Sequence, residues 1–505
     1  MKILIKGGSV LTLDEQDQFH ERIDILIEGE YIALIGQDID PAGVDRIINA
    51  DAKLVMPGLN IAHAHSNENL FKGTFDQYPL ELWLLYAFPP IDWSIPAEVI
   101  YPRTILGAAE MLLGGATTVQ DDVPIMVSPD LAQDQLDSIF QAYSDIGMRV
   151  NLMIDMLDKP FQEQFPFVEQ VFPNEILQSL NAGPGWTADD FIDLCKYAIQ
   201  RWHEPDGRMK FVLSPSGPQW CTDEFLIRLG ELSVEQNLAI HTHVLESKLQ
   251  VMTGEEFYGT SVVRHLDDLG LLSPRMTLAH CIWVSDDDVR RIGDSGVTVV
   301  HNPASNMKLG SGLMPLRQLL DSGCNLALGV DGAASNDSQN PFEMMSMTAF
   351  LHKIAHPNPR LWPKSEEILR MATRGGAQSE LIHHEVGALT VGMKADIIIL
   401  NTNTINFTPL NDYKKHLVYS ESGSSVETSI VNGKIVMEDR EILTVDLEDS
   451  KRHLRSLMPA LTKEFHKASV SSNRIWPYME EIYSRAVRTP TTLNRWIKDI
   501  HRSSE

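Results

Sequence analysis

The sequence contains few cysteines and no pattern that would cross-link them. Four occur in 505 residues, at positions 195, 221, 281 and 324, and none belongs to a Cys-x-x-Cys motif. Small domains that depend on disulfides carry many more cysteines at close spacing. The pattern therefore predicts reduced, mostly buried thiols, and we expect a cytoplasmic protein.

Long apolar runs and an excess of basic residues are also absent. No uninterrupted apolar segment reaches the roughly 18–20 residues of a membrane helix, and the first residues do not read as a cleaved signal. Acidic residues number 69 against 42 lysines and arginines, which gives a formal charge of −27. Nucleic acids and anionic membranes attract basic surfaces, so this balance argues against both as partners.

The two ends of the chain share a β-rich texture, within a composition that is typical of globular proteins. Hydrophobic residues make up 43% and charged residues 22% of the sequence. Short β-branched runs bounded by turn residues fill residues 1–56 and return in residues 388–445. We expect these two segments to form one small β-sandwich domain.

The centre, residues 57–387, alternates between apolar strand-like runs and helical stretches. The strand-like runs are residues 151–155, 210–214, 239–243, 276–280, 297–301 and 326–331, and helical examples are 223–236, 315–322 and 365–377. Such alternation predicts an α/β fold, and a (β/α)8 TIM barrel fits the length. A doubly wound sheet is the alternative, but no Gly-x-Gly-x-x-Gly motif opens a helix after the first strand.

The last segment, residues 446–505, is rich in charge and predicts amphipathic helices. They are expected near residues 454–467, 478–487 and 491–500. The segment lies beyond the returning β-rich part and carries apolar residues such as Leu461 and Ile482. We therefore expect a helical extension that forms a subunit contact in a homo-oligomer.

Histidines and one aspartate stand at the ends of four predicted central strands. His63 and His65 are two residues apart and so face the same side of a strand, as do His241 and His243. His280 and Asp331 end two later strands. Each residue alone could be an ordinary core histidine or a helix cap. Because barrel strands deliver functional groups at their C-terminal ends, the full set instead predicts a metal site.

The same residues carry a resemblance to a known family. His-x-His on the first strand, His-x-x-Glu at 243–246, then His280 and Asp331 resemble the amidohydrolase superfamily. Its aminohydrolase and triazine hydrolase subgroup, which includes adenosine-type and guanine-type deaminases and chlorohydrolases, is the most similar. The segments 57–65 (PGLNIAHAH), 303–312 (PASNMKLGSG), 371–377 (MATRGGA) and 392–397 (GMKADI) resemble its motifs, and the similarity spans nearly the whole chain.

The resemblance implies roles for individual residues. His63, His65, His243 and Asp331 would hold the metal, and Glu246 would be the carboxylate that transfers protons. His280 would position the water or stabilise developing charge. His241 matches no required ligand, and we interpret it as an inward-facing barrel residue.

The expected cofactor is one divalent ion. Imidazole and carboxylate groups suit zinc, which we predict, or iron(II) as the alternative. Relatives with two metals use a carboxylated lysine at the end of the fourth strand. Here residues 211–217 have no lysine at that end, and Lys210 stands at the start of the strand.

The implied reaction is hydrolytic deamination of a small heterocyclic substrate. Metal-bound hydroxide would attack the amine-bearing carbon of an N-heterocycle while Glu246 protonates the ring and the leaving amine. Removal of an alkylamino or chloro substituent from a triazine-like ring is one alternative. A catalytically silent binding protein on this fold is another, but the complete ligand and acid set argues against it.

Four further residues are candidates for substrate contact. Glu68 follows His65 by three residues and could accept N–H bonds, or it could be a loop residue in solvent. Trp83 and Trp220 could stack on a planar ring or belong to the wall or core. Asn306 could fix its loop, the reading we favour, or touch substrate.

Overall fold

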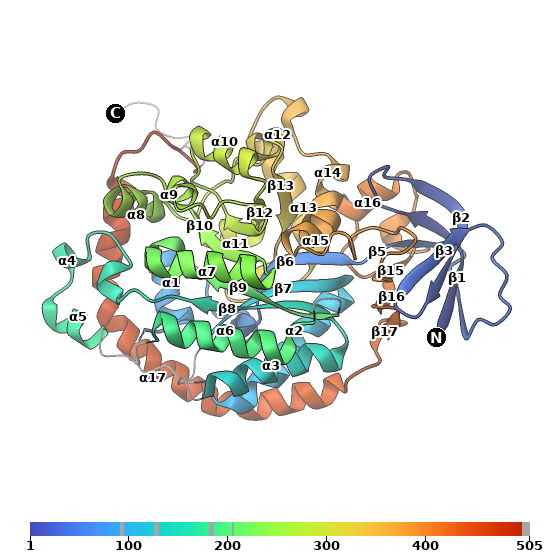
Figure 1. Ribbon diagram of the computed structural model, residues 1–505, viewed down its shortest axis with the longest axis horizontal. Coiled ribbons are helices and arrows are strands. Elements are labelled where there is room, and N and C mark those ends of the chain that lie inside the picture. The colour runs from blue at the N-terminus through green and yellow to red at the C-terminus, as the bar shows by residue number, and fades with distance from the viewer. Residues whose placement is uncertain (91–94, 126–130, 181–185, 205–206, 497–505) are drawn as a thin grey trace.

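The computed structural model describes residues 1–90, 95–125, 131–180, 186–204 and 207–496. Its main body is a ring of parallel strands covered by helices, and a second sheet lies at one end of the molecule (Figure 1). The predicted architecture, a (β/α)8 barrel with a small β domain from both chain ends, is therefore confirmed.

The strands of the ring are all parallel to their neighbours. They are β6 (Leu59–His65), β7 (Ala116–Pro124), β8 (Arg149–Met156), β9 (Met209–Pro215), β10 (Ile240–Val244), β11 (Met276–His280), β12 (Thr298–His301), and a last strand in two pieces, β13 (Asn325–Leu328) and β14 (Asp331–Gly332). β13 pairs with β12 and β14 pairs with β6, so the last strand closes the ring. All six predicted central strands are present, whereas β7 was not predicted.

Helices connect the strands and cover the outside of the ring. The longer ones are α2 (Ile100–Leu113), α3 (Ala132–Ile146), α6 (Ala188–Trp202), α7 (Asp223–Gln236), α8 (Lys248–Tyr258), α10 (Asp286–Ser295) and α13 (Pro341–Ile354). The shorter ones are α1 (Leu80–Ala87), α4 (Val168–Val171), α5 (Asn174–Leu180), α9 (Val262–Asp268), α11 (Pro303–Lys308), α12 (Leu316–Asp321), α14 (Ser365–Arg370), α15 (Gly376–Ser379) and α16 (Tyr413–Tyr419).

Helix α7 has the predicted limits because both of its ends are capped. The Thr222 side chain accepts a hydrogen bond from the backbone N–H of Phe225 at the start. At the other end Asn237 adopts φ +54°, the left-handed conformation that commonly ends a helix.

The second sheet joins strands from both ends of the chain. Its strands are β1 (Lys2–Leu11), β2 (Phe19–Glu28), β3 (Tyr31–Gly36), β4 (Arg46–Asn49), β5 (Lys53–Pro57), β15 (Ile397–Asn401), β16 (Val426–Val431), β17 (Lys434–Glu438) and β18 (Glu441–Ile442). The two halves meet where β5 pairs antiparallel with β15. This sheet has an apolar core of its own, which includes Ile3, Ile25, Val55 and Ile397.

The chain passes from the small sheet into the barrel through a single residue, Gly58, between β5 and β6. A Cβ atom at this position would lie 2.1 Å from the Thr117 side chain. Only glycine permits that approach, so Gly58 allows the chain to enter β6 directly beside the neighbouring barrel strand β7.

The C-terminal extension forms one long helix, α17 (Leu447–Arg488), and not separate helices. It contains Pro459 and Pro477 and continues through both, because it packs along α1, α2 and α8 of the same chain. Residues 491–496 are not helical, which corrects the last predicted helix, and residues 497–500 lie outside the described part.

The apolar face of α17 is turned toward its own barrel. Leu461 and Ile482, which suggested a subunit contact, are buried within the chain. The expected oligomer therefore stays a prediction, and these two residues no longer argue for it.

Two smaller expectations can also be compared with the structure. All four cysteines are unpaired and buried, as predicted for reduced thiols. Among the described residues, no helix combines the length and apolar character needed to cross a membrane.

Candidate metal and catalytic centre

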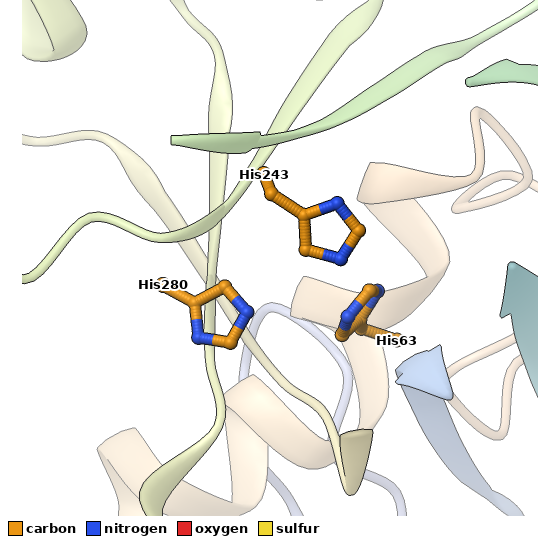
Figure 2. A group of neighbouring side chains, drawn as sticks. All are labelled: His63, His243 and His280. Atoms are coloured by element: carbon orange, nitrogen blue, oxygen red, sulfur yellow. The ribbon is translucent and has the colours of Figure 1, made fainter. Parts of the chain in front are cut away.

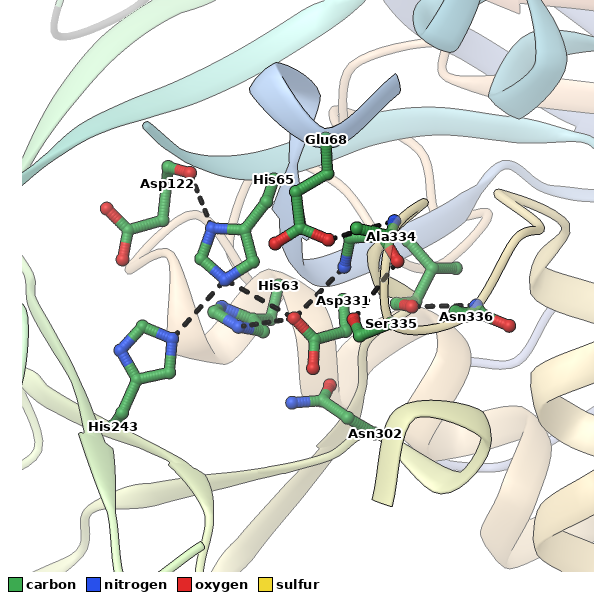
Figure 3. Close-up of polar contacts among 12 residues, drawn as sticks. His63, His65, Glu68, Asp122, His243, Asn302, Asp331, Ala334, Ser335 and Asn336 are labelled. Carbon is green, nitrogen blue, oxygen red and sulfur yellow. Dashed lines mark hydrogen bonds and ion pairs between the residues drawn. The ribbon is translucent and has the colours of Figure 1, made fainter. Parts of the chain in front are cut away.

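The predicted ligands come together at one face of the barrel, where the C-terminal ends of the strands meet. His63 and His65 lie at the end of β6, His243 in β10 and Asp331 at the start of β14 (Figure 3). His63, His65 and Asp331 are buried, and His243 is half-buried. The structure thus brings all four predicted residues together, and their role as ligands stays a prediction.

The nitrogen and oxygen atoms of these side chains converge on one point. Nε2 of His65 lies 3.3 Å from Oδ1 of Asp331 and 3.3 Å from Nε2 of His243. Nε2 of His63 lies 3.6 Å from the same Asp331 oxygen. Figure 2 shows the rings of His63, His243 and His280 grouped together, and those of His63 and His243 are arranged edge to face.

Hydrogen bonds on the far side of the rings fix which nitrogen is available. Nδ1 of His65 donates to the carbonyl of Asp122 at 2.6 Å, and Nδ1 of His243 donates to the carbonyl of Ser216 at 2.7 Å. Because a carbonyl only accepts, Nδ1 carries a proton in both rings, and Nε2 is the nitrogen that faces the cluster. Two imidazole Nε2 atoms turned toward each other, with a buried carboxylate alongside, are a suitable donor set for a divalent cation, which would replace any proton held there.

His241 has a contact that the sequence did not indicate. It is fully buried inside the barrel, as interpreted, and its Nε2 lies 2.9 Å from Nδ1 of His63. His63 therefore also has a partner on its far side. Its Nε2 has no hydrogen-bond partner among the described residues, which fits a ligand atom.

The electrostatic field at this point favours positive charge. Burial lowers the pKa of His65, but the carboxylates of Asp331 and Glu68 outweigh it and raise that pKa to about 10. Burial raises the pKa of Asp331, but the neighbouring histidines, His63 first, hold it well below its usual range. A cation placed among these groups would be strongly stabilised.

Two residues of the site have strained backbone. Asp331 adopts φ +59° and His280 adopts φ +73°, a region that residues with side chains rarely occupy. Each such residue costs about 1–3 kcal/mol, and strain of this kind gathers at functional sites.

Glu246 and His280 face the metal cluster from the β10 and β11 side. Oε2 of Glu246 lies 3.7 Å from Nε2 of His280, and Oδ2 of Asp331 lies 3.8 Å from the same nitrogen. Burial raises the pKa of Glu246 well above its usual value, and Asp331 and Glu81 raise it further. Burial lowers the pKa of His280. Burial thus shifts Glu246 toward its protonated form and His280 toward its neutral form.

Asn306 holds His280 in place. Its amide oxygen accepts a hydrogen bond from Nδ1 of His280 at 2.8 Å. Nε2 of His280 is then an acceptor that faces the reacting groups. The loop role favoured for Asn306 is thus joined by a role in orienting His280.

Glu68 is not a loop residue in solvent. It is fully buried, and its Oε2 accepts a hydrogen bond from the backbone N–H of Ala334 at 3.0 Å. The carboxylate lies against Gly332, where a Cβ atom would be only 1.7 Å from it. Its Oε1 has no hydrogen-bond partner in the described residues. Glu68 therefore holds the loop after Asp331 and keeps one oxygen for another partner.

The two tryptophans lie in different surroundings. Trp83 is 4% exposed and packs in an apolar cluster with Phe71 and Leu461. Trp220 is half-buried and lines a crevice beside Gln219. Trp83 is accordingly part of the wall behind the site, whereas Trp220 is partly exposed at a narrow crevice.

Asp122 and Asp155 were missed by the sequence analysis. They end β7 and β8, and each places a carboxylate oxygen within 4.8 Å of a nitrogen of His243. Ser214, at the end of β9, donates to Asp122 at 2.9 Å. The strand-end rule that found the histidines would have found Asp155, which ended a predicted strand.

Lys210 is placed as the sequence indicated. It lies at the start of β9 and forms a buried ion pair with Glu385 at 2.8 Å, away from the metal cluster. The described residues at the other end of β9 include no lysine that could bridge two metal ions.

Comparison with known proteins identifies the family and similar chains. The profile of the amidohydrolase family matches residues 54–436. The chain is 34% identical over 445 residues to a 5'-deoxyadenosine deaminase of Methanosarcina mazei, covering 88% of this chain and 94% of that protein. It is likewise 34% identical to a 5-methylthioadenosine/S-adenosylhomocysteine deaminase of Thermoanaerobacter pseudethanolicus, covering 89% and 96%.

A solved structure has the same fold as this chain. The atrazine chlorohydrolase of Arthrobacter aurescens, determined in complex with zinc, superimposes with a TM-score of 0.82 at 27% sequence identity. The match covers 90% of this chain and 100% of that one. The resemblance to deaminases and triazine hydrolases stated from the motifs is thereby confirmed.

Proposed function

Because the chain belongs to the amidohydrolase family, we propose that it is a metal-dependent deaminase of an aminated N-heterocycle. The observation that carries the proposal is the position of Glu246, which lies 3.7 Å from His280 at the edge of the histidine and aspartate cluster. Its raised pKa keeps a proton available for the ring and the leaving amine.

We propose zinc as the ion, held by His63, His65, His243 and Asp331, with iron(II) as the alternative. Three imidazole nitrogens and a carboxylate suit both metals. The zinc in the similar chlorohydrolase structure supports the first. When bound, such an ion lowers the pKa of water from about 15.7 toward 7, so that hydroxide forms near neutral pH.

Different residues of the chain then carry out the separate proton transfers. Asp331, which the neighbouring histidines keep ionised, would accept a proton from the attacking water. His280 orients that water through its unprotonated Nε2, because Nδ1 is held by Asn306. Glu246 donates its proton to the ring nitrogen next to the carbon under attack, and a proton then passes to the departing amine.

Removal of a chloro or alkylamino substituent remains the second candidate, because the chain is similar to an atrazine chlorohydrolase. Chloride leaves without a proton, whereas an amine must be protonated first. The buried Glu246, whose pKa is raised by burial, therefore favours an amine as the leaving group.

The test is a leaving-group assay on the purified, metal-loaded protein. Aminated purines, pyrimidines, pterins and triazines are screened for ammonia, alkylamine and chloride release, with Glu246→Gln as the control. We expect ammonia from at least one ring and none from the control. Chloride or alkylamine alone would favour the second candidate, and activity only on open-chain amides or esters would contradict both.

A further inference from the structure

The chain that follows α17 crosses the rim of the barrel on the side that bears the site. Residues 487–496, which we call the C-terminal strap, begin beside α8, as Figure 1 shows for the end of α17. Nζ of Lys248, the first residue of α8, donates to the carbonyls of Val487 at 2.8 Å and Thr489 at 2.7 Å. The loop after β10 is thus tied to the strap.

The last described residues of the strap hold two more loops. Arg495 donates to the carbonyl of Val284 at 2.5 Å and accepts from the backbone N–H of Leu313 at 2.8 Å. The indole N–H of Trp496 donates to the carbonyl of Gly310 at 2.9 Å. The strap therefore connects the loops after three successive strands, β10, β11 and β12.

These loops carry the reacting groups or hold them. Lys248 comes two residues after Glu246, and Val284 follows His280 on the loop after β11. Gly310 follows α11, the helix that bears Asn306. The strap is consequently fastened to the segments that surround the substrate position.

Access to the reacting groups is narrow as a result. The exposed fraction is 1% for His280, 4% for Glu246 and 5% for Asp331. Helix α17 adds to the cover, because Leu461 packs in one cluster with Trp83 of α1. A ligand can reach these groups only past the side chains at the rim.

A small crevice lies close to Glu246 in the chain and in space. It is lined by residues of α1, the start of α8 and the end of α17. Its lining includes Ser247, which follows Glu246, and Val487 and Trp496 of the strap. Glu81 also lines it, and the second carboxylate oxygen of Glu81 is buried and has no hydrogen-bond partner among the described residues. The strap thus borders a space beside the loop that bears Glu246.

We propose that the C-terminal strap selects substrates by size: it admits a bare aminated heterocycle and excludes the same ring bearing a sugar or another large substituent. The inference rests on the deaminase function proposed above. The similar deaminases are named for substituted adenines, and the family profile ends at residue 436, before the strap. The strap lies outside the part of the chain that the profile matches, and it contacts the loops of the shared site.

The first test compares each bare ring with its nucleoside on the metal-loaded wild-type protein. The pairs are adenine and 5'-deoxyadenosine, guanine and guanosine, and cytosine and cytidine. We expect kcat/KM for the bare ring to exceed that of its nucleoside by about tenfold or more, the scale of steric discrimination in a pocket. Equal or better use of the nucleoside would overturn the inference and leave the deaminase function intact. No ammonia from any compound would contradict the deaminase function itself.

The second test loosens the strap with Arg495→Ala/Trp496→Ala and uses Arg452→Ala, on the exposed face of α17, as the matched control. In the double variant we expect kcat/KM for the nucleoside, divided by kcat/KM for the bare ring, to rise about tenfold. Hydrogen exchange should become faster in residues 247–249 and 310–313, and the control should change neither. If the double variant does not fold, Trp496→Phe removes only the indole hydrogen bond. A folded variant whose ratio is unchanged, or which loses both activities equally, would refute size selection.

Discussion

The amide oxygen of Asn306 accepts a hydrogen bond from Nδ1 of His280 over 2.8 Å, which leaves Nε2 of His280 facing Glu246. Asn306 is thus a positioning residue. We predict that Asn306→Ala lowers kcat by about tenfold, because a hydrogen bond of this kind is worth about 0.5–1.5 kcal/mol. Metal content, measured by elemental analysis, should stay at the wild-type value. A change in KM alone would instead indicate direct contact with substrate.

Glu246→Gln should separate proton transfer from metal binding. The amide cannot supply a proton, so we expect turnover to fall by about 10²–10⁴ or more. Metal content should not change, since Glu246 is not among the assigned ligands. Loss of the ion in this variant would show that the assignment is wrong.

One divalent ion per chain is the expected metal content. The four assigned ligands converge on one point, and Lys210 is engaged with Glu385 at the opposite end of its strand. Treatment with a chelator should abolish activity, and titration with zinc should restore it fully at one equivalent. A requirement for two ions at full activity would contradict this, and would point to Asp122 and Asp155 as ligands of the second.

Glu68→Ala should lower kcat/KM by about ten- to a hundredfold, as expected for loss of a charged hydrogen bond worth roughly 1.5–3 kcal/mol. If Oε1 of Glu68 binds substrate, metal content should be unchanged. The same variant also frees the backbone N–H of Ala334. Weakened zinc binding, measured by competition with a chelator, would show that Glu68 acts mainly through the Asp331 loop.

A buried histidine away from the site should make stability depend on pH. Burial lowers the pKa of His352 to about 3, and its Nε2 lies 3.0 Å from Nε2 of His301. In the unfolded chain the imidazole of His352 binds a proton near pH 6.5, whereas in the folded protein it stays neutral down to about pH 3. Above pH 6.5 this difference does not reduce the free energy of unfolding. Between pH 6.5 and 3, that free energy falls by about 1.4 kcal/mol per pH unit.

The measurement is urea unfolding between pH 6.5 and 4.5. His352→Gln does not titrate in this range, so its stability should fall less steeply than that of the wild type. Parallel slopes for the two proteins would contradict the prediction.

The barrel and its ligands could be predicted because their signals are local. A strand that ends in His63 and His65 shows its apolar run and its ligands within a few residues. Strand β7 was missed because Thr117, Gln120 and Asp122 are polar yet fully buried. Their partners lie on other strands, and no local pattern reveals such burial.

The roles of Glu68 and of the C-terminal segment could not be predicted because they depend on distant contacts. The partner of Glu68 is Ala334, on the last barrel strand's loop. Likewise, α17 continues through two prolines only because α1, α2 and α8 hold it. Sequence periodicity shows that such a helix is amphipathic, but not which surface its apolar face covers.

The pairing of β5 with β15 has a consequence for biosynthesis. Pro57 and Ile397 are partners, yet the whole barrel lies between them in the chain. During translation β1 to β5 can pair with one another, but one edge of β5 stays open until the barrel has been made. An open apolar edge recruits other chains, so the nascent protein is most prone to aggregate in this interval. Slow synthesis of the central segment would lengthen the time for which this edge is exposed. The exposure ends once β15 has been synthesised and pairs with β5.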